Sequence, residues 1–221
     1  MQTVALLNDP LNPAAGGGTL NARGSDAREL VRINSDLGAY ELVVDQHLVV
    51  TSTGDGIDAT DGVITLREAV LAANARDGVD TITFAAGLEG RITLTEGELA
   101  ITDSVTILSD GRITISGDAN GDDILDGDGF TDVDQSKDAP GDRMSDNSRI
   151  FVLTGDDNVS ALDGLTLTGG HAVGEFYSDD GGTVHADVKA ITISNSTISG
   201  NQAEGDGGGV YIGFTDAATL T

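Results

Sequence analysis

The sequence predicts an all-β fold in which short parallel strands stack in successive turns, and two internal repeats with a common residue pattern point to it. Leu162–Gly170 reads LDGLTLTGG and Ile193–Asn201 reads ISNSTISGN, an offset of 193 − 162 = 31 residues. Asp180–His185, DGGTVH, returns as Asp206–Tyr211, DGGGVY, 206 − 180 = 26 residues later. The first repeat alternates apolar with hydroxyl residues, many of them β-branched, and its short runs end in Gly, Asn or Asp, as strands that turn corners do.

Strands of three to five residues that end at corners have no hairpin partner nearby. Each is therefore expected to pair with the equivalent strand one period later, so that like side chains stack and the core is continuous. This arrangement is a right-handed parallel β-helix, a solenoid with its apolar side chains inside.

The pattern continues upstream at a shorter offset. Arg91–Thr95, RITLT, recurs as Arg112–Ser116, RITIS, 112 − 91 = 21 residues later, and two more strand-like runs lie between them, at Leu99–Thr102 and Val105–Leu108. Such spacing predicts three short strands per turn. Further strands are expected at residues 81–84 and 149–153.

One segment, residues 65–76, has helical spacing. Its apolar positions are Leu66, Ala69, Val70 and Ala73. Thr65 is the expected N-cap with Glu68 at the third helical position, and Asp77-Gly78 is expected to end the helix. We expect this single short helix to cap the open end of the first turn, because an uncovered sheet edge pairs with other chains.

Composition limits the partners of the chain. The 221 residues carry a net charge of −26, with 37 acidic and 11 basic side chains. This charge repels nucleic acid and anionic lipid and attracts divalent cations, although adaptation to a saline habitat would also explain it. No segment has the roughly 20 apolar residues that cross a membrane. The absence of Cys excludes disulfides and thiolate metal sites.

The acidic residues are concentrated at Asp118–Asp134, DANGDDILDGDGFTDVD, which has seven Asp and no Lys or Arg. Alternate oxygen-bearing side chains in a tight loop are typical of Ca²⁺ sites. Asp123 and Gly129 depart from an EF-hand, so a loop with serial aspartates is expected, or else a solvated, disordered acidic loop over residues 118–147. The candidate Ca²⁺ ligands are Asp118, Asn120, Asp122, Asp126, Asp128, Asp132 and Asp134.

The order VVTSTGDG, ITLREAVLAANA, DGVDTITF, an acidic loop, RIFVL, LDGLTLTGG and NSTISGN resembles the bacterial cell-surface parallel β-helix proteins that carry a CSLREA-type motif. The resemblance covers residues 48–221. Leu66–Ala69 matches the LREA core, whereas Ile64-Thr65 stand where the Cys-Ser would be. The resemblance implies the fold and an extracellular or cell-surface location, although no export signal is visible. It implies no reaction.

Residues 1–41 resemble the segment that ends such a unit. The expected organisation is a tail-like segment or N-terminal extension at residues 1–41, a first strand and capping helix at 42–84, and β-helix turns at 85–221 that contain the acidic loop and are open at the C-terminus. We therefore expect the chain to be part of a longer repeat array.

Carbohydrate-active β-helix enzymes need a groove with paired carboxylates, or Ca²⁺ together with a basic residue that takes a proton next to a uronate carboxyl. Arg91, Arg112 and Arg149 begin similar strands and could line one face, but an Arg at a strand start is expected to be a solvated edge charge. Asp163, Asp179, Asp180 and Asp206 are the matching acidic candidates. No catalytic residue is assigned.

Other polar residues favour structural roles. His47, His171 and His185 share no metal-ligand spacing, and His185 is expected to stack in a turn where the next turn has Tyr211. Asn195 and Asn201 are expected at corners, with left-handed backbone angles and hydrogen bonds to the backbone.

The sequence therefore favours a non-enzymatic extracellular structural or adhesin-type β-helix module stabilised by Ca²⁺. Its expected partners are divalent cations, a surface glycan or neighbouring β-helix units. The alternatives are a uronate polysaccharide lyase or epimerase and an ice- or surface-binding repeat, which the drift in turn length disfavours.

Overall fold

The computed structural model describes residues 48–119, 147–173 and 179–221 in full, and the backbone of four short strands at residues 31–32, 43–44, 123–126 and 129–132. The chain divides into two compact units, Met1–Gln46 and His47–Thr221. In the first unit, β1 (Val31–Arg32) pairs antiparallel with β2 (Val43–Val44).

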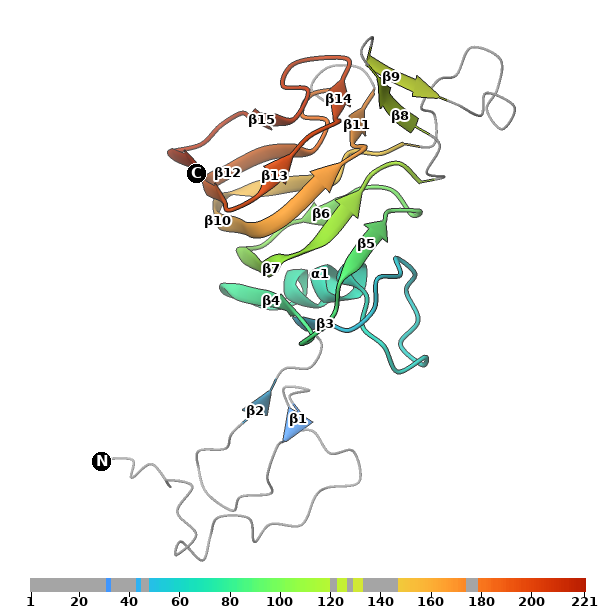
Figure 1. The fold of residues 1–221 in the computed structure, drawn as a ribbon. Helices are drawn as coiled ribbons and strands as arrows, with labels where there is room; N and C mark the ends of the chain where they lie inside the picture. Colours follow the sequence, from blue (N-terminus) through green and yellow to red (C-terminus); the bar gives the residue numbers. More distant parts are fainter. Residues whose placement is uncertain are drawn as a thin grey trace, which may run out of the picture. The chain divides into compact units, whose positions relative to one another are not determined.

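The second unit is predominantly β. Its main sheet is parallel and contains β3 (Val49–Val50), β4 (Asp80–Phe84), β5 (Gly90–Thr93), β6 (Leu99–Ile101), β7 (Val105–Ser116), β10 (Phe151–Thr168), β12 (Val184–Ser194), β13 (Thr197–Ile198), β15 (Val210–Ile212) and β16 (Ala217–Leu220). Two small sheets pair β11 (His171–Ala172) with β14 (Gln202–Ala203) in parallel and β8 (Asp123–Asp126) with β9 (Gly129–Asp132) antiparallel. Figure 1 shows the parallel strands stacked from β3 and β4, beside the helix α1 (Leu66–Asn74), toward β15.

The pairing register divides the main sheet into three ranks of stacked strands. The first rank contains β6, residues 151–155 of β10, residues 184–188 of β12, and β15. The second contains β3, β4, residues 105–108 of β7, 159–163 of β10, 190–194 of β12, and β16. The third contains β5, residues 113–116 of β7, 165–168 of β10, and β13.

The longest strands run through the corners between ranks. β7 has 12 residues, β10 has 18 and β12 has 11, whereas the sequence predicts strands of three to five. Gly111 and Gly164 lie at two of the corners with φ of 88° and 70°, a left-handed conformation that favours glycine. The backbone therefore changes direction at these corners, and the parallel pairing stops before each corner and resumes after it.

The register confirms both downstream repeats. Leu162 pairs with Ile193, which is the offset of 31 residues, and Val184 pairs with Val210, which is the offset of 26. The upstream offset of 21 is wrong, because Gly90 pairs with Ile113, 113 − 90 = 23 residues later. A shift of two residues leaves the same side chains facing inward, so alternation alone cannot distinguish the two registers.

Aliphatic side chains form continuous columns inside each rank. In the second rank Ile82, Ile107, Leu162 and Ile193 stack and are at most 4% exposed. The third and first ranks add the columns Ile92, Ile115 and Leu167, and Leu99, Phe151 and Val184. Burial of these columns removes apolar surface from water along the whole stack, which is the main favourable contribution to folding.

Helix α1 begins as the sequence predicts. The side chain of Thr65 accepts from the Glu68 N–H at 3.2 Å, and Glu68 Oε2 accepts from the Thr65 N–H at 2.9 Å, which completes a capping box. The helix ends at Asn74, two residues before the expected end. The Asn74 side chain donates to the Ala100 carbonyl of β6 at 2.8 Å and accepts from the Thr102 N–H just after it at 2.9 Å. α1 packs against β3, β4 and β6.

Candidate functional site

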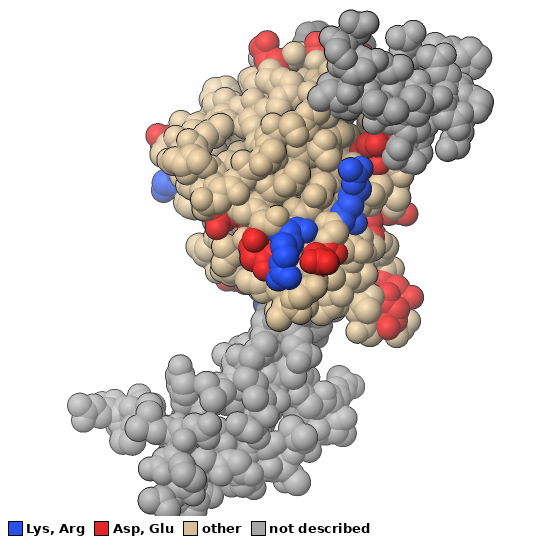
Figure 2. Space-filling model, viewed as in Figure 1, with Lys and Arg blue, Asp and Glu red and all other residues tan. Residues whose placement is uncertain are grey.

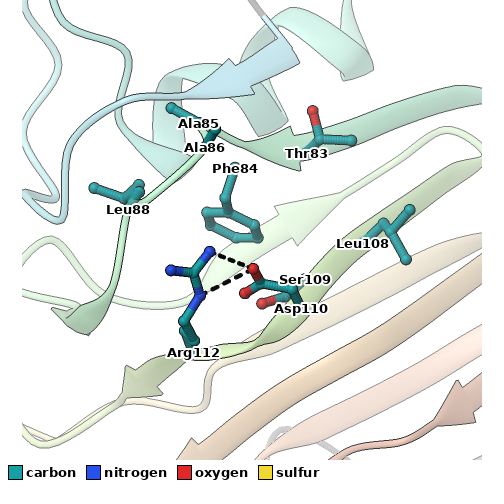
Figure 3. A pocket seen from close by; sticks show the side chains of 9 residues that line it. All are labelled: Thr83, Phe84, Ala85, Ala86, Leu88, Leu108, Ser109, Asp110 and Arg112. Carbon is teal, nitrogen blue, oxygen red and sulfur yellow. Dashed lines mark hydrogen bonds and ion pairs between the residues drawn. The ribbon is translucent and has the colours of Figure 1, made fainter.

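A pocket of about 350 Å³ opens at a corner between the second and third ranks. Figure 3 shows the Phe84 ring pointing from β4 toward the charged pair Arg112 and Asp110, with Leu88 and Leu108 on either side. The remaining lining residues are Thr83, Ala85, Ala86 and Ser109. The pocket thus combines an aromatic and aliphatic wall with one exposed ion pair, the usual composition of a small-ligand site.

The pocket arises because neighbouring corners differ in length. The pairing of β4 with β7 ends at Thr83 and Leu108, and the pairing of β5 with β7 begins at Gly90 and Ile113. Six residues, 84–89, therefore lie beside only four, 109–112. The two corners cannot stay in register, and the space between them remains open.

The corner of β7 also differs in length from the corner of β10, its neighbour on the other side. On β10, Asp163 pairs with Leu108 and Leu165 pairs with Ile113, so Gly164 alone spans the corner. A Cβ atom at Gly164 would lie 2.1 Å from the carbonyl oxygen of Ser109, so the two corners are in close contact. The sequence did not reveal this pocket, because unequal corner lengths can be counted only once the register is known.

The charged pair at the mouth of the pocket is held within one turn. Arg112 donates from Nε to Asp110 Oδ2 at 2.9 Å and also from Nη2, and Glu89 Oε2 lies 4.0 Å from Arg112 Nη1. The hydrogen bonds from Arg112 lower the pKa of the Asp110 carboxyl below its ordinary value, and the same hydrogen bonds raise the pKa of Arg112. Both side chains remain accessible, 59% and 43% exposed.

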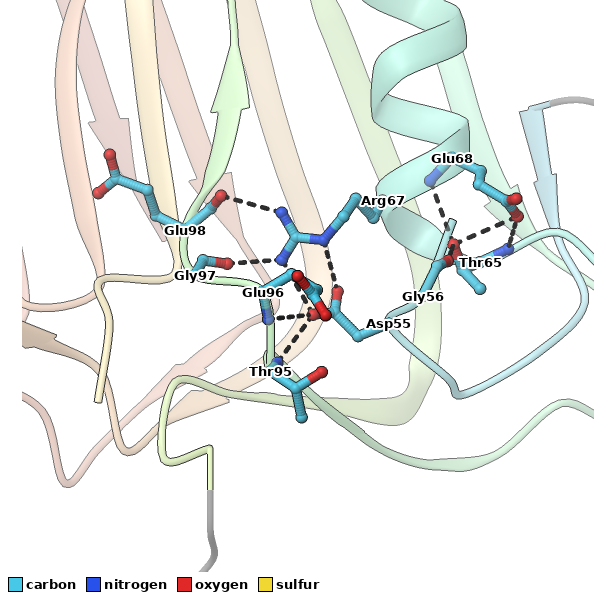
Figure 4. A network of polar contacts seen from close by, with 9 residues as sticks. All are labelled: Asp55, Gly56, Thr65, Arg67, Glu68, Thr95, Glu96, Gly97 and Glu98. Atoms are coloured by element: carbon cyan, nitrogen blue, oxygen red, sulfur yellow. Dashed lines mark hydrogen bonds and ion pairs between the residues drawn. The ribbon is translucent and has the colours of Figure 1, made fainter. Parts of the chain in front are cut away.

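A second polar network lies buried beneath α1 (Figure 4). Asp55 Oδ1 accepts from Arg67 Nε at 3.0 Å, and Asp55 Oδ2 accepts from Arg67 Nη2 at 3.0 Å. Asp55 Oδ2 also accepts from the backbone N–H groups of Thr95 and Glu96, and Arg67 donates to the Gly97 and Glu98 carbonyls. The Arg of the LREA sequence therefore connects the helix to two separate loops and is unavailable to a ligand.

The predicted Ca²⁺ ligands lie mostly outside the described residues. Asp118 follows β7 and is 5% exposed, and a Cβ atom at Gly169 would lie 2.8 Å from its Cβ, so the two residues pack closely. The backbone places Asp126 and Asp132 on the hairpin of β8 and β9. Asn120, Asp122, Asp128 and Asp134 lie outside the described residues. Among the residues that are described, no three His or acidic side chains form a metal-binding group.

The three strand-start arginines do not share one face. Arg91 and Arg112 are exposed, as the sequence predicts, and Arg91 pairs with Thr114 in the third rank. Arg149 is buried instead, because its Nε donates to the Gly181 carbonyl at 3.0 Å and its Nη1 to Glu98 Oε2 at 3.2 Å. Burial lowers the pKa of Arg149.

The acidic candidates are divided between two corners. Asp180 Oδ1 accepts from the Asp206 N–H at 2.6 Å, and the backbone carbonyl of Asp179 accepts from the Gly205 N–H at 2.9 Å. Asp163 lies elsewhere and accepts from Ser194 and Asn195 on the next level. These contacts fix corners of the stack.

The histidines also have structural positions. His185 pairs with Tyr211 across the stack with ring centroids 5.0 Å apart, which confirms the predicted stacking but places it in a strand instead of a turn. Its Nε2 lies 3.1 Å from Asp187 Oδ2. His171 is buried in β11, and His47 lies outside the described residues.

The two asparagines differ. Asn195 has the predicted left-handed backbone, with φ of 49°. Asn201 does not, but its side chain makes the predicted hydrogen bonds to the backbone: Oδ1 accepts from the Gly170 N–H at 2.8 Å and Nδ2 donates to the Leu167 carbonyl at 3.1 Å. It bridges two levels of the stack.

On the face drawn in Figure 2, neutral side chains cover most of the described surface, and the basic side chains near the centre of the view lie next to Asp or Glu. Among the described residues, no helix is long and apolar enough to span a membrane. A comparison of the chain with family models finds no match, and comparisons with curated proteins and with solved structures find none either.

Proposed function

We propose that residues 48–221 form a right-handed parallel β-helix that serves as a non-enzymatic structural or adhesin-type module outside the cell. The observation that carries the proposal is the set of three parallel ranks with continuous aliphatic columns. A strand stack of this kind is a rigid support whose length is set by the number of its turns.

The use of charged side chains also supports a structural role. Buried Arg67 and Arg149 hold loops, and exposed Arg112 is paired with Asp110. A uronate lyase needs a basic group that can take a proton from its substrate, and an arginine held by carboxylates serves that purpose poorly.

The two edges of the stack differ in how well they are covered. α1 packs against β3, β4 and β6 at one end. At the other, the aliphatic columns continue into β13, β15 and β16, where Ile198, Val210 and Ile212 are only partly buried and Leu220 is 56% exposed. We propose that a further strand-forming unit packs on this edge.

We also propose that Ca²⁺ orders the acidic segment 118–134.

An assay for uronate cleavage tests the absence of catalysis. The full chain, with and without Ca²⁺, is incubated with pectate and alginate while the ultraviolet absorbance of unsaturated products is recorded. We expect no turnover above a heat-denatured control. Robust turnover that disappears on denaturation would overturn the structural role.

Protease treatment of intact source cells tests the location of the protein. We expect the chain to be cleaved before cytoplasmic marker proteins are.

A further inference from the structure

We propose that the corner pocket lined by Phe84, Asp110 and Arg112 binds one neutral sugar ring, as part of a glycan. The inference rests on the proposed adhesive role and names the ligand class that this role would require. It depends on the shape, the apolar wall and the charge of the pocket, which are independent observations.

The shape of the pocket limits the ligand to a small ring. Its volume of about 350 Å³ is at the lower end of the usual range for ligand sites. The space exists because six residues, 84–89, lie beside four, 109–112, and both segments are anchored by the strand pairs at either side. The pocket is therefore formed by the fold before any ligand arrives, which lowers the entropic cost of binding.

The wall suits the C–H face of a sugar. Phe84 and Leu88 pack against the core with part of their surface exposed, and Leu108 is 43% exposed. Figure 3 shows the Phe84 ring directed into the space above the ion pair. A pyranose presents C–H groups on one face and hydroxyl groups around its edge. Its C–H face can cover this apolar surface while its hydroxyl groups face Asp110 and Arg112.

The ion pair offers both kinds of hydrogen-bonding partner. The Asp110 carboxylate accepts from sugar hydroxyl groups, and the Arg112 guanidinium donates to hydroxyl or ring oxygens. Because Gly111 lies between them with φ of 88°, both side chains reach the same side of the corner. Each is exposed enough to contact a ligand without breaking the pair.

Charge excludes an acidic sugar. Arg112 is already neutralised by Asp110, and Glu89 lies 4.0 Å away, so the mouth of the pocket has no surplus positive charge. The net charge of −26 opposes an approaching anion as well. The pocket therefore selects a neutral ring over a uronate.

Saturation-transfer NMR and calorimetric titration of the full chain test the proposal. The probes are methyl glycosides of glucose, galactose, mannose and N-acetylglucosamine, and galacturonate is the charged counterpart. We expect at least one neutral glycoside to bind saturably in the millimolar range and galacturonate to bind at least about tenfold more weakly, the effect of one unfavourable charge contact.

Two variants locate the binding. Arg112→Ala should weaken it about tenfold through loss of charge-assisted hydrogen bonds. Ala86→Trp, at the exposed rim, should abolish it by filling the pocket. Arg91→Ala, on an exposed arginine outside the pocket, is the matched control and should leave binding unchanged. Melting curves confirm that each variant is folded.

The inference is overturned if no neutral glycoside binds saturably, if galacturonate binds better, or if Ala86→Trp binds as the natural sequence does. Its failure is separate from that of the proposed function. Uronate turnover would remove the structural role whatever the pocket binds, whereas the absence of glycoside binding without turnover would remove only the pocket's role.

Discussion

The carboxylate of Asp55 forms a bidentate ion pair with the guanidinium of Arg67, with Oδ1 3.0 Å from Nε and Oδ2 3.0 Å from Nη2. Their side chains are 1% and 10% exposed. Four further hydrogen bonds join the pair to the backbone of residues 95–98: Asp55 Oδ2 accepts two of them and Arg67 donates the other two. Two buried charges are tolerated here because the pair is bidentate and both partners make further hydrogen bonds to the backbone.

Removal of one partner leaves the other charged and buried. Arg67→Ala should therefore lower the free energy of unfolding by about 3–5 kcal/mol, as measured by urea denaturation. Arg91→Ala is the control, because Arg91 is exposed on β5, and it should change the same quantity by less than about 0.5 kcal/mol. Equal losses in the two variants would show that the buried pair has no special role.

The capping box of α1 gives a smaller, local effect. Thr65→Ala removes the side-chain acceptor for the Glu68 N–H and should cost about 1 kcal/mol of unfolding free energy. Thr65→Ser keeps the acceptor and should restore most of that loss. If Thr65→Ser lowered the free energy of unfolding as much as Thr65→Ala does, the capping role would be contradicted.

The parts of the fold that could be predicted are those fixed by alternation. Leu162 over Ile193 follows from the repeat, because a one-residue slip would turn apolar side chains outward. The pairing of Gly90 with Ile113 could not be predicted, because a two-residue slip preserves the inward face. The register depends instead on the number of residues in each corner, six at 84–89 and four at 109–112.

The contents of the candidate site follow from that register. Phe84 and Arg112 are separated by 28 residues, 112 − 84, and share a pocket only because the corners between paired strands differ in length. The burial of Arg149 depends similarly on the Gly181 carbonyl, which lies 32 residues further along the chain. Neither contact has a local signature. The helix, in contrast, has one, because Thr65 and Glu68 satisfy each other within a single turn.

Asp163 should titrate below the ordinary Asp value of 3.8, because the Ser194 hydroxyl and the Asn195 amide donate to its charged form and lower its pKa. A lowered pKa in the folded state adds stability above the unfolded value, and this stability is lost as the pH falls below 3.8 through the folded pKa. NMR titration of the carboxyl carbon measures the shift. Ser194→Ala should move the pKa upward, and an unchanged titration would contradict the assigned cause.

Calcium should raise the melting temperature of the chelated protein, because the aspartates of segment 118–134 repel one another without a cation. The combined variant Asp126→Asn and Asp128→Asn should reduce the shift, and Mg²⁺ at the same concentration should produce less of it. The combined variant Asp156→Asn and Asp157→Asn is the control, because it removes the same charge outside the segment. A melting curve that Ca²⁺ leaves unchanged would rule out the site.

Gly164 tests whether the corners of β7 and β10 are as close as the register requires. A Cβ atom there would lie 2.1 Å from the Ser109 carbonyl oxygen, and the backbone φ is 70°. Gly62 is the matched control, because its φ is 79° but no atom lies within 4 Å of an added Cβ. Gly62→Ala should therefore lower the free energy of unfolding only by the cost of a Cβ atom in the left-handed conformation, about 1–2 kcal/mol.

Gly164→Ala should lower the free energy of unfolding by the same backbone cost and by roughly a further 1–3 kcal/mol. The further loss is expected because the clash separates two strands that are hydrogen-bonded on both sides of the corner. Urea denaturation of both variants gives the difference directly. Since Ser109 and Gly111 belong to the same corner as Arg112, the Gly164 variant should also disturb the pocket, whereas Gly62→Ala should not. Equal destabilisation by the two substitutions would mean that the corners are not in contact in solution.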